Sequence, residues 1–415
     1  MKKRPVRVTH LSNGIRVVTE RIPYGRSVSI GVWVQCGSVC ETQQNNGIAH
    51  FMEHMFFKGT QRRTAREIAY SLESLGGSLN ASTGKELSVY TALVLDEYMP
   101  QAVDVLFDIV QNPLFADADI AREKKVVLTE INHAREDPEE MALDYLYMNL
   151  FPEHPLGYLI YGTDKNVKKF TRQNLVDFHQ QFYRPERMII AAAGQVDHGN
   201  FVAEIEKRFA PGLARDYHQV PHESPNAWPA GIPTAKYVQD SSQQAHLCTG
   251  FRIFSYADPR RYPLVLLDML FGGGMSSWLF QNIREKYGFA YSLYSFVDLM
   301  AQTGVFGTYM ACDARRTAAA LELLQQEFTR LRRKGISQHE LDIVKKQAHG
   351  HIILGLEGSS RRMHKIAEAE IYHAEHVMPE EVARRVERVT TTQISELVEA
   401  FMDPAQQVTT VVAPQ

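Results

Sequence analysis

Gly47-Ile48-Ala49-His50-Phe51-Met52-Glu53-His54-Met55 is the stretch around which the rest of the chain is organised. If it is helical, His50 and His54 lie one turn apart on one face, and Glu53 lies beside them. The order H-x-x-E-H is the reverse of the H-E-x-x-H zinc signature. Two imidazoles on Zn²⁺ leave a tetrahedral site in need of one water and one further protein ligand from elsewhere in the chain.

The residues between and beside these histidines are apolar, which predicts a helix that is almost entirely buried. Chance is an alternative, because a chain with 16 histidines produces such a pattern by accident at a level of roughly a few per cent. Two buried imidazoles beside a buried carboxylate are costly, however, unless they have a function. The stretch therefore predicts a metal site.

Length and composition indicate a soluble globular enzyme. A chain of 415 residues exceeds one ordinary hydrophobic core and fits two domains. Hydrophobic residues make up 44% and charged residues 22%, which is typical of globular proteins. The formal net charge of -3 gives no overall attraction to nucleic acid or to anionic membranes, so neither is an expected partner.

The lack of a recognisable targeting signal and the small number of cysteines predict a cytoplasmic protein. The basic start of the chain is not followed by an apolar segment of signal-peptide type, and no window of 18 apolar residues predicts a membrane helix. Four cysteines are few for a secreted chain of this size. Cys36 and Cys40 share one face of a predicted strand; as a zinc pair they would lack partners, so free core thiols in a reducing compartment are favoured.

The order of predicted elements mixes strands and helices in both halves. In the first half, strands are expected at 14–20, 27–34, 78–83, 87–95 and 188–194, and helices at 47–55, 64–75, 99–110, from about 117, and near 171–182. In the second half, strands are expected at 245–251, 289–298 and 303–311, and helices at 262–271, 316–333 and 338–354.

The two halves resemble copies of one α+β unit. Residues 91–96 (TALVLD) are echoed by residues 308–313 (TYMACD), and a long helix follows each. A proline-rich stretch separates the halves. We therefore expect a metal-binding domain at 1–212, a linker at 213–234, and a second domain at 235–415 that has no H-x-x-E-H and holds no metal.

Two further features of the first half bear on a site. Glu123 and Glu130 are seven residues apart in a predicted helix and share a face, where an acid is costly unless a positive charge meets it. The strand at 78–83 follows Gly76-Gly77 and could be an exposed sheet edge that pairs with an extended substrate. The alternative is an ordinary interior hairpin strand.

Several stretches together resemble the pitrilysin and insulinase family of zinc peptidases. The resemblance covers nearly the whole chain and is closest to the short branch that includes the mitochondrial processing peptidase subunits and bacterial relatives. It is carried by residues 50–60 (HFMEHMFFKGT), 76–81 (GGSLNA), 154–157 (HPLG), 272–280 (GGGMSSWLF) and 284–291 (REKYGFAY). The implied fold is α+β, with two homologous α/β-roll domains in tandem, each an antiparallel-rich sheet packed with helices, in a clamshell dimer.

The resemblance also assigns roles around the metal. In the family a glutamate some 75 residues after the motif is the third zinc ligand, and here 75 residues separate His54 from Glu130. The implied ligands of one Zn²⁺ per chain are thus His50, His54 and Glu130, with Glu53 as the general base. Glu123 is implied to accept the second N–H of a ligand imidazole; a solvated helix glutamate is the alternative.

Substrate contacts are implied in both halves. Asn80 and Ala81 would line the substrate on the edge strand, and Arg284 and Tyr291 would donate hydrogen bonds to a substrate carbonyl. From the sequence alone, Arg284 reads as a surface helix arginine. Because long members of the family fuse two such halves, the resemblance implies a homodimer in which this pair reaches the zinc site of the other subunit.

The sequence thus predicts a cytoplasmic zinc metalloendopeptidase that hydrolyses unfolded peptides or presequence-like segments. One alternative is a non-catalytic structural subunit of a larger complex built on the same fold. Another is a zinc hydrolase of a non-peptide substrate, which leaves the edge strand and the Arg284 and Tyr291 pair without a role.

Overall fold

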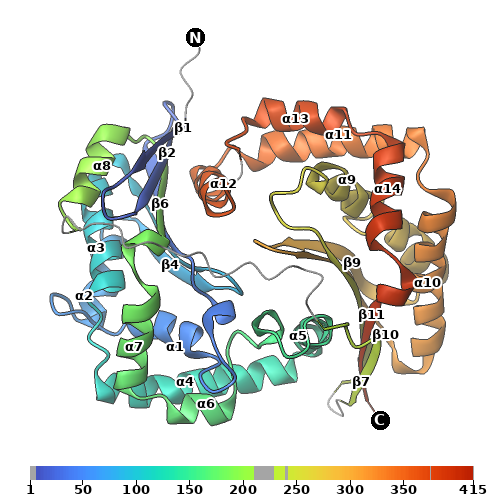
Figure 1. Cartoon of the computed structure of the whole chain (residues 1–415), viewed down its shortest axis with the longest axis horizontal. Coiled ribbons are helices and arrows are strands. Elements are labelled where there is room, and N and C mark those ends of the chain that lie inside the picture. The colour runs from blue at the N-terminus through green and yellow to red at the C-terminus, as the bar shows by residue number, and fades with distance from the viewer. Residues whose placement is uncertain (1–5, 210–228, 239–241, 374, 415) are drawn as a thin grey trace. The chain divides into compact units, whose positions relative to one another are not determined.

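The computed structural model describes residues 6–209, 229–238, 242–373 and 375–414. These residues form two compact units: the first takes those within 1–131, 158–221 and 355–376, and the second takes those within 132–157, 222–354 and 377–415. Each unit combines a mixed sheet with helices (Figure 1), so the predicted two-domain α+β class is confirmed. The linker predicted at 213–234 lies largely outside the described residues.

The first unit is built on a six-stranded sheet in the order β1-β2-β6-β3-β5-β4. Its strands are β1 Val6–His10, β2 Arg16–Arg21, β3 Ser27–Val34, β4 Ser78–Thr83, β5 Ser88–Leu95 and β6 Met188–Gly194. The β2 and β6 strands run parallel, and the other neighbours run antiparallel. Since β4 pairs only with β5 within the described residues, the expectation of an edge strand at 78–83 is confirmed.

The second unit repeats this arrangement in a five-stranded sheet, β7-β11-β8-β10-β9. Its strands are β7 Thr234–Val238, β8 Gln244–Ile253, β9 Ala290–Leu299, β10 Gly304–Asp313 and β11 Val408–Ala413. As in the first unit without β1, one parallel pair stands at one end and antiparallel pairs follow. The repeat expected from the sequence is therefore a repeat of topology, in which β9 corresponds to β4.

The helices of the first unit are α1 Ile48–Phe56, α2 Ala65–Glu73, α3 Met99–Gln111, α4 Asp117–Glu136, α6 Asp164–Lys169, α7 Arg172–Phe182, α8 His198–Glu206 and α12 Ser359–Ile371. Those of the second are α5 Pro138–Leu150, α9 Arg261–Phe271, a π-helix at Phe280–Glu285, α10 Thr317–Lys334, α11 Gln338–Gly355, α13 Pro379–Glu387 and α14 Thr391–Phe401. The division between the units falls inside α4, between Ile131 and Asn132. Among the described helices, none is long and apolar enough to cross a bilayer.

Both faces of the first sheet are covered, which explains why β3 and β6 are buried along almost their whole length. One face packs against α1 and α3 in the main core cluster. The other face holds Trp33 and Ile189, which pack with Met363 and Ile366 of α12 (Figure 1). The sheet that supports α1 is therefore closed by a helix contributed from the far end of the sequence.

The second unit uses a helix from the first half of the sequence in the same way. The α5 helix packs on β8 and β11, where Asn149 Nδ2 donates to Thr410 Oγ1 at 3.0 Å. The two halves thus exchange helices, α5 in one direction and α12 in the other. The sequence analysis predicted neither helix.

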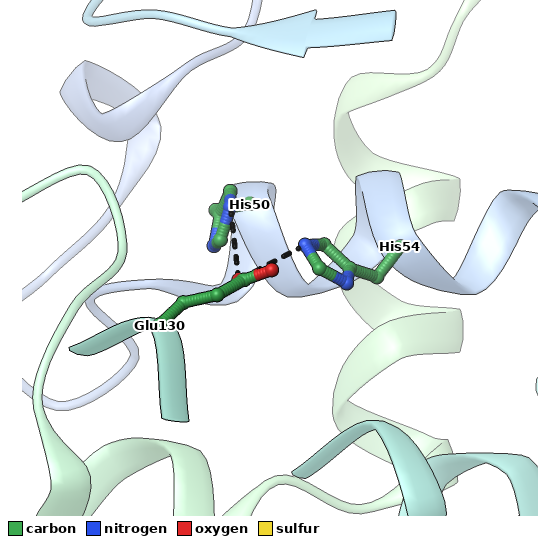
Figure 2. A group of neighbouring side chains, drawn as sticks. All are labelled: His50, His54 and Glu130. Atoms are coloured by element: carbon green, nitrogen blue, oxygen red, sulfur yellow. Dashed lines mark ion pairs between the residues drawn. The ribbon is translucent and has the colours of Figure 1, made fainter. Parts of the chain in front are cut away.

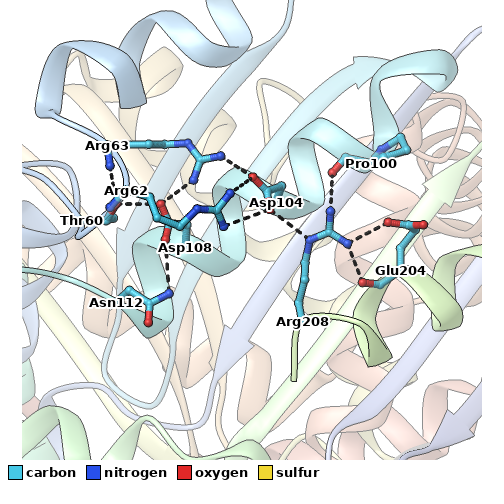
Figure 3. A network of polar contacts seen from close by, with 9 residues as sticks. All are labelled: Thr60, Arg62, Arg63, Pro100, Asp104, Asp108, Asn112, Glu204 and Arg208. Atoms are coloured by element: carbon cyan, nitrogen blue, oxygen red, sulfur yellow. Dashed lines mark hydrogen bonds and ion pairs between the residues drawn. The ribbon is translucent and has the colours of Figure 1, made fainter. Parts of the chain in front are cut away.

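The loop that follows α1 is fixed by a buried ionic network (Figure 3). The side chain of Asp108 on α3 is fully buried, and it accepts a hydrogen bond from Thr60 Oγ1 at 2.7 Å and an ion pair from Arg63 at 2.5 Å. Arg63 and Arg208 also pair with Asp104, one turn earlier on α3. Because each buried charge has an opposite charge beside it, the network holds the end of α1 against α3.

A glycine allows close backbone contact where α1 begins. Gly47, the N-cap of α1, has φ +96°, and a Cβ there would lie 2.7 Å from Gly162 Cα and from Tyr161 O. Gly76 also has a positive φ, +72°, but a Cβ there would meet nothing within 4 Å. Gly47 therefore carries a steric requirement that Gly76 does not.

We expect Gly47→Ala to lower the free energy of unfolding by about 2–4 kcal/mol, because left-handed strain and a backbone clash add together. Gly76→Ala, as the matched control, should cost only about 1 kcal/mol. Urea unfolding of both variants measures the difference. Equal losses in the two variants would show that the contact with residues 161–162 does not constrain α1.

Candidate metal centre

The α1 helix presents its polar side chains on one narrow face. Six of its nine residues are buried apolar side chains that join the main core: Ile48, Ala49, Phe51, Met52, Met55 and Phe56. His50, Glu53 and His54 occupy the remaining face at the spacing that the helix period requires. The expectation of a helical, mostly buried stretch is confirmed.

Three side chains converge in front of this face (Figure 2). His54 Nε2 lies 3.3 Å from Glu130 Oε2, and His50 Nε2 lies 3.9 Å from the same oxygen. The two imidazole rings are 4.8 Å apart between centroids. The long interval between the motif and Glu130 is thus bridged by α4, which brings its carboxylate against α1.

The donor set fits a divalent metal ion such as Zn²⁺. One potential ligand atom from each of the three residues lies within 4.8 Å of the others. Two atoms bound to one tetrahedral zinc at about 2.0–2.1 Å are about 3.4 Å apart, which is close to the observed separations. His50 Nδ1 and Glu130 Oε2 are buried without a hydrogen-bond partner, so part of the cluster's polar capacity is unused within the protein.

The protonation state of His50 suits a ligand. Burial, and secondarily the neighbouring His54, lowers the pKa of His50 to about 4. The imidazole is therefore neutral at physiological pH, and a neutral imidazole is the form that binds metals.

Glu123 lies behind the cluster, where it contacts His54. Its Oε2 is 3.2 Å from His54 Nδ1, and its Oε1 is 2.8 Å from Lys58 Nζ. The Glu123 side chain is only 7% exposed, so Lys58 supplies the positive charge that a buried acid requires. In the tautomer that carries its proton on Nδ1, His54 donates a hydrogen bond to this carboxylate, and the lone pair of Nε2 is left on the side of Glu130.

Glu53 shares the face of the two histidines and is held from β4. Thr83 Oγ1 donates to Glu53 Oε2 at 2.5 Å. Burial raises the pKa of the Glu53 carboxyl, while the hydrogen bond from Thr83 and the proximity of His54 oppose the rise. A carboxylate with a raised pKa and a fixed orientation is a candidate for proton exchange with a nearby water.

A buried acid also caps the start of α1. Glu41 Oε2 accepts from the Gly47 N–H and from Asn46 Nδ2, both at 2.8 Å, and Oε1 accepts from the Ala49 N–H at 2.8 Å. These backbone groups have no partner within the helix, and a negative charge at a helix N-terminus is favourable. Glu41 therefore fixes the turn that bears His50.

The substrate-contact residues expected on β4 lie on opposite faces of that strand. Asn80 is exposed, and its Oδ1 accepts from the Ala81 N–H at 2.9 Å. Ala81 packs against the core cluster that includes α1. Since β4 contacts α1 and ends at Thr83, the edge strand runs past the candidate metal centre.

Arg284 and Tyr291 belong to the second unit, where they are neighbours. The Arg284 guanidinium lies 5.3 Å from the centre of the Tyr291 ring and 4.6 Å from that of Phe280. Tyr291 is 81% exposed at the start of β9. The structure thus pairs these two side chains, and their role toward a substrate stays a prediction.

Sequence reasoning missed Lys58, Thr83 and Glu41. The spacing could have indicated Lys58, because it follows His54 by four residues, which is about one helical turn. Thr83 and Glu41 contact elements that are separate from their own. The residues next to them in the sequence do not indicate these contacts.

Together the fold and the cluster define a two-domain α+β protein with a candidate metal centre in its first unit. Residues 16–164 match the family described as Insulinase (Peptidase family M16), and residues 169–348 match the Peptidase M16 inactive domain. The chain belongs to this peptidase family, and the family resemblance is confirmed. The resemblance to the branch of mitochondrial processing peptidases stays a prediction.

Similar proteins are named zinc proteases. An uncharacterized zinc protease of Mycobacterium tuberculosis (strain ATCC 25618 / H37Rv) is 39% identical over 94% of this chain and 89% of its own length. The uncharacterized zinc protease YmxG of Bacillus subtilis (strain 168) is 36% identical over 93% of each chain. A crystal structure of a protease from Helicobacter pylori has a TM-score of 0.91 at 21% identity over 99% of both chains, which shows the shared fold.

The cap of α1 predicts a specific pH dependence of stability. Burial raises the pKa of Glu41 from 4.5 to about 7, against the lowering effect of its three hydrogen bonds. Between these values the folded chain holds a proton that the unfolded chain has released, so the contribution of Glu41 to stability falls as pH rises through this window. Above about pH 7 the loss is complete.

We expect Glu41→Gln to remove this component. The difference in free energy of unfolding between wild type and variant should shift in favour of the wild type as pH is lowered from 7.5 to 5, because only the wild type can take up the proton. Urea unfolding of both proteins at several pH values measures it. Parallel pH profiles would contradict the assignment.

Proposed function

We propose that this chain is a zinc-dependent endopeptidase that hydrolyses peptide bonds in extended, unfolded peptides or presequence-like segments. His50, His54 and Glu130 hold one zinc ion per chain, and Glu53 is the general base. The observation that carries the proposal is the convergence of these three donor side chains, with two of their buried polar atoms unpaired. The naming of relatives as zinc proteases supports it.

A zinc ion at this site supplies a Lewis acid that polarises the scissile carbonyl and makes water more acidic. Glu53 takes the proton of the attacking water and delivers it to the leaving amine. Thr83 fixes the carboxylate of Glu53 through its hydroxyl, so that one oxygen remains directed to the reaction. Glu123 keeps His54 in the tautomer that leaves Nε2 free for the metal.

The β4 strand is the proposed binding edge for the substrate main chain. Its outer side makes no strand pair among the described residues, so an extended peptide can add to the sheet by backbone hydrogen bonds. Because β4 ends at Thr83, which contacts Glu53, a peptide on this edge lies beside the base. Backbone pairing demands little sequence specificity, which fits unfolded substrates. Asn80 and Ala81 then contact the substrate from this strand.

Arg284 and Tyr291 are proposed to contact the substrate from the second unit, as hydrogen-bond donors. We also propose a homodimer in which this pair serves the site of the other subunit, and a cytoplasmic location. None of these three points is needed for the assignment of the metal ligands and the base.

Metal content and peptide cleavage test the function directly. We expect about one zinc per purified chain and cleavage of a quenched fluorescent peptide that stops with a chelator and returns with added zinc. Glu53→Gln should retain the zinc and lose turnover by about 10²- to 10⁴-fold. Glu73→Gln, an exposed glutamate on α2, is the matched control and should behave like the wild type.

The outcomes separate the alternatives. Full turnover in Glu53→Gln would exclude this residue as the base. Metal-free protein without cleavage would favour a structural subunit, and zinc-loaded protein that cleaves no peptide would favour a hydrolase of another substrate.

Glu123 has its own test. Glu123→Gln weakens the acceptor for His54 Nδ1 and leaves Lys58 without its counter-charge, so the zinc affinity should fall about 10- to 100-fold. Competition with a fluorescent chelator measures the affinity. Glu136→Gln, an exposed position on the same helix, controls for general effects. An unchanged affinity in Glu123→Gln would rule out the positioning role.

A further inference from the structure

A pair of thiols lies in the segment that joins β3 to α1. Cys36 follows β3 and is completely buried, whereas Cys40 ends a short 3-10 turn, Ser38–Cys40, and is partly exposed. The two thiols are neighbours, close enough that each affects the pKa of the other. Both cysteines are free, as are Cys248 and Cys312 in the second unit, which are buried.

The two thiols have different environments. Arg187 Nη1 lies 3.8 Å from Cys40 Sγ as a donor. The neighbouring Cys36 thiol and the charge of Arg187 lower the pKa of Cys40 to about 7, although burial opposes them. Burial holds the pKa of Cys36 well above its usual range. Cys40 is thus the accessible nucleophile, and Cys36 keeps its proton.

We propose that Cys36 and Cys40 form an oxidisable dithiol that peroxides convert to an intramolecular disulfide. The Cys40 thiolate attacks one peroxide oxygen, the O–O bond breaks, and hydroxide leaves, which gives a sulfenic acid. The Cys36 sulfur then attacks the Cys40 sulfur, the S–O bond breaks, and water leaves with the proton of the Cys36 thiol. Overall, two thiols and one H₂O₂ give one disulfide and two waters.

The same segment is tied to the candidate metal centre at two points. The Ser38 and Val39 N–H groups donate to Gly84 O at 3.2 Å and to Lys85 O at 2.8 Å, in the turn that follows Thr83. Glu41, next to Cys40, caps α1. A disulfide needs sulfur atoms about 2.05 Å apart, so the two free thiols must approach each other and displace this segment.

The effect on turnover, which rests on the proposed function, follows from these connections. Displacement of residues 37–41 shifts the Glu41 cap and the turn beside Thr83, and these two contacts orient His50 and Glu53. We therefore expect the oxidised form to turn over peptides at about one tenth of the rate of the reduced form, or more slowly still. Small displacements of reacting groups cost large factors in rate.

One tryptic peptide reports the modification without any activity assay. Residues 27–58 contain no internal Lys or Arg and carry Cys36 and Cys40 as their only cysteines. After mild H₂O₂ treatment of the full zinc-loaded chain and denaturing alkylation, this peptide should be lighter by two hydrogen atoms and unalkylated. Dithiothreitol should restore both alkylation sites, which distinguishes the disulfide from sulfoxides of Met52 or Met55.

Variants assign the two roles. Cys40→Ser should abolish the disulfide, and Cys36→Ala should leave a sulfenic acid on Cys40 that dimedone traps. Cys312→Ser, the matched control in the second unit, should oxidise like the wild type. Alkylation of both cysteines after peroxide, or added oxygen on Cys40 while Cys36 remains a free thiol, would overturn the proposal.

The activity arm separates this inference from the proposed function. Peroxide should slow peptide cleavage by the wild type reversibly and leave Cys40→Ser unaffected. Disulfide formation in a chain that never cleaves peptides would defeat the proposed function and leave the dithiol standing. Zinc-dependent cleavage without disulfide formation would do the reverse, and disulfide formation without a change in turnover would overturn the link to the site.

Discussion

The burial of α1 is the constraint on which the candidate site depends. This helix places two imidazoles and a carboxylate next to the main core, where each polar atom without a partner costs about 1–3 kcal/mol. Partners come from separate segments: Thr83 for Glu53, and Glu123 with Lys58 for His54. His50 Nδ1 and Glu130 Oε2 have no hydrogen-bond partner among the described residues. Nε2 of each imidazole faces the Glu130 carboxylate, and this is the donor set that the proposed zinc ion would bind.

The scaffold around α1 explains how such a cluster is held. The first sheet is buried on both faces, and its second face is closed by α12, while α5 closes part of the sheet in the second unit. Each unit therefore depends on residues from the other half of the sequence. The topological repeat also gives the proposed substrate contacts a common origin, because Asn80 lies on β4 and Tyr291 on β9, the corresponding edge strands of the two sheets.

The segment from Cys36 to Glu41 links the first sheet, the thiol pair and the start of α1. It ends a core strand, holds a thiol pair, contacts the turn after Thr83 and supplies the cap of α1. The charge of Cys40 is also among the influences that raise the pKa of Glu41. A chemical change at the thiols would therefore act on the backbone that positions the face of α1 with His50, Glu53 and His54, without a direct contact to the proposed metal ligands.

The sequence by itself determined what depends on short spacings. The helical period placed His50, Glu53 and His54 on one face of α1, and alternating or apolar runs located most strands. Motifs along the chain indicated the family and suggested Glu130. Only the tertiary structure decided which distant groups meet: Lys58 with Glu123, Thr83 with Glu53, Glu41 with the first turn of α1, and α12 with the first sheet. These contacts form between elements that are remote in the chain, and their geometry is set by how the elements pack, which no local pattern of residues records.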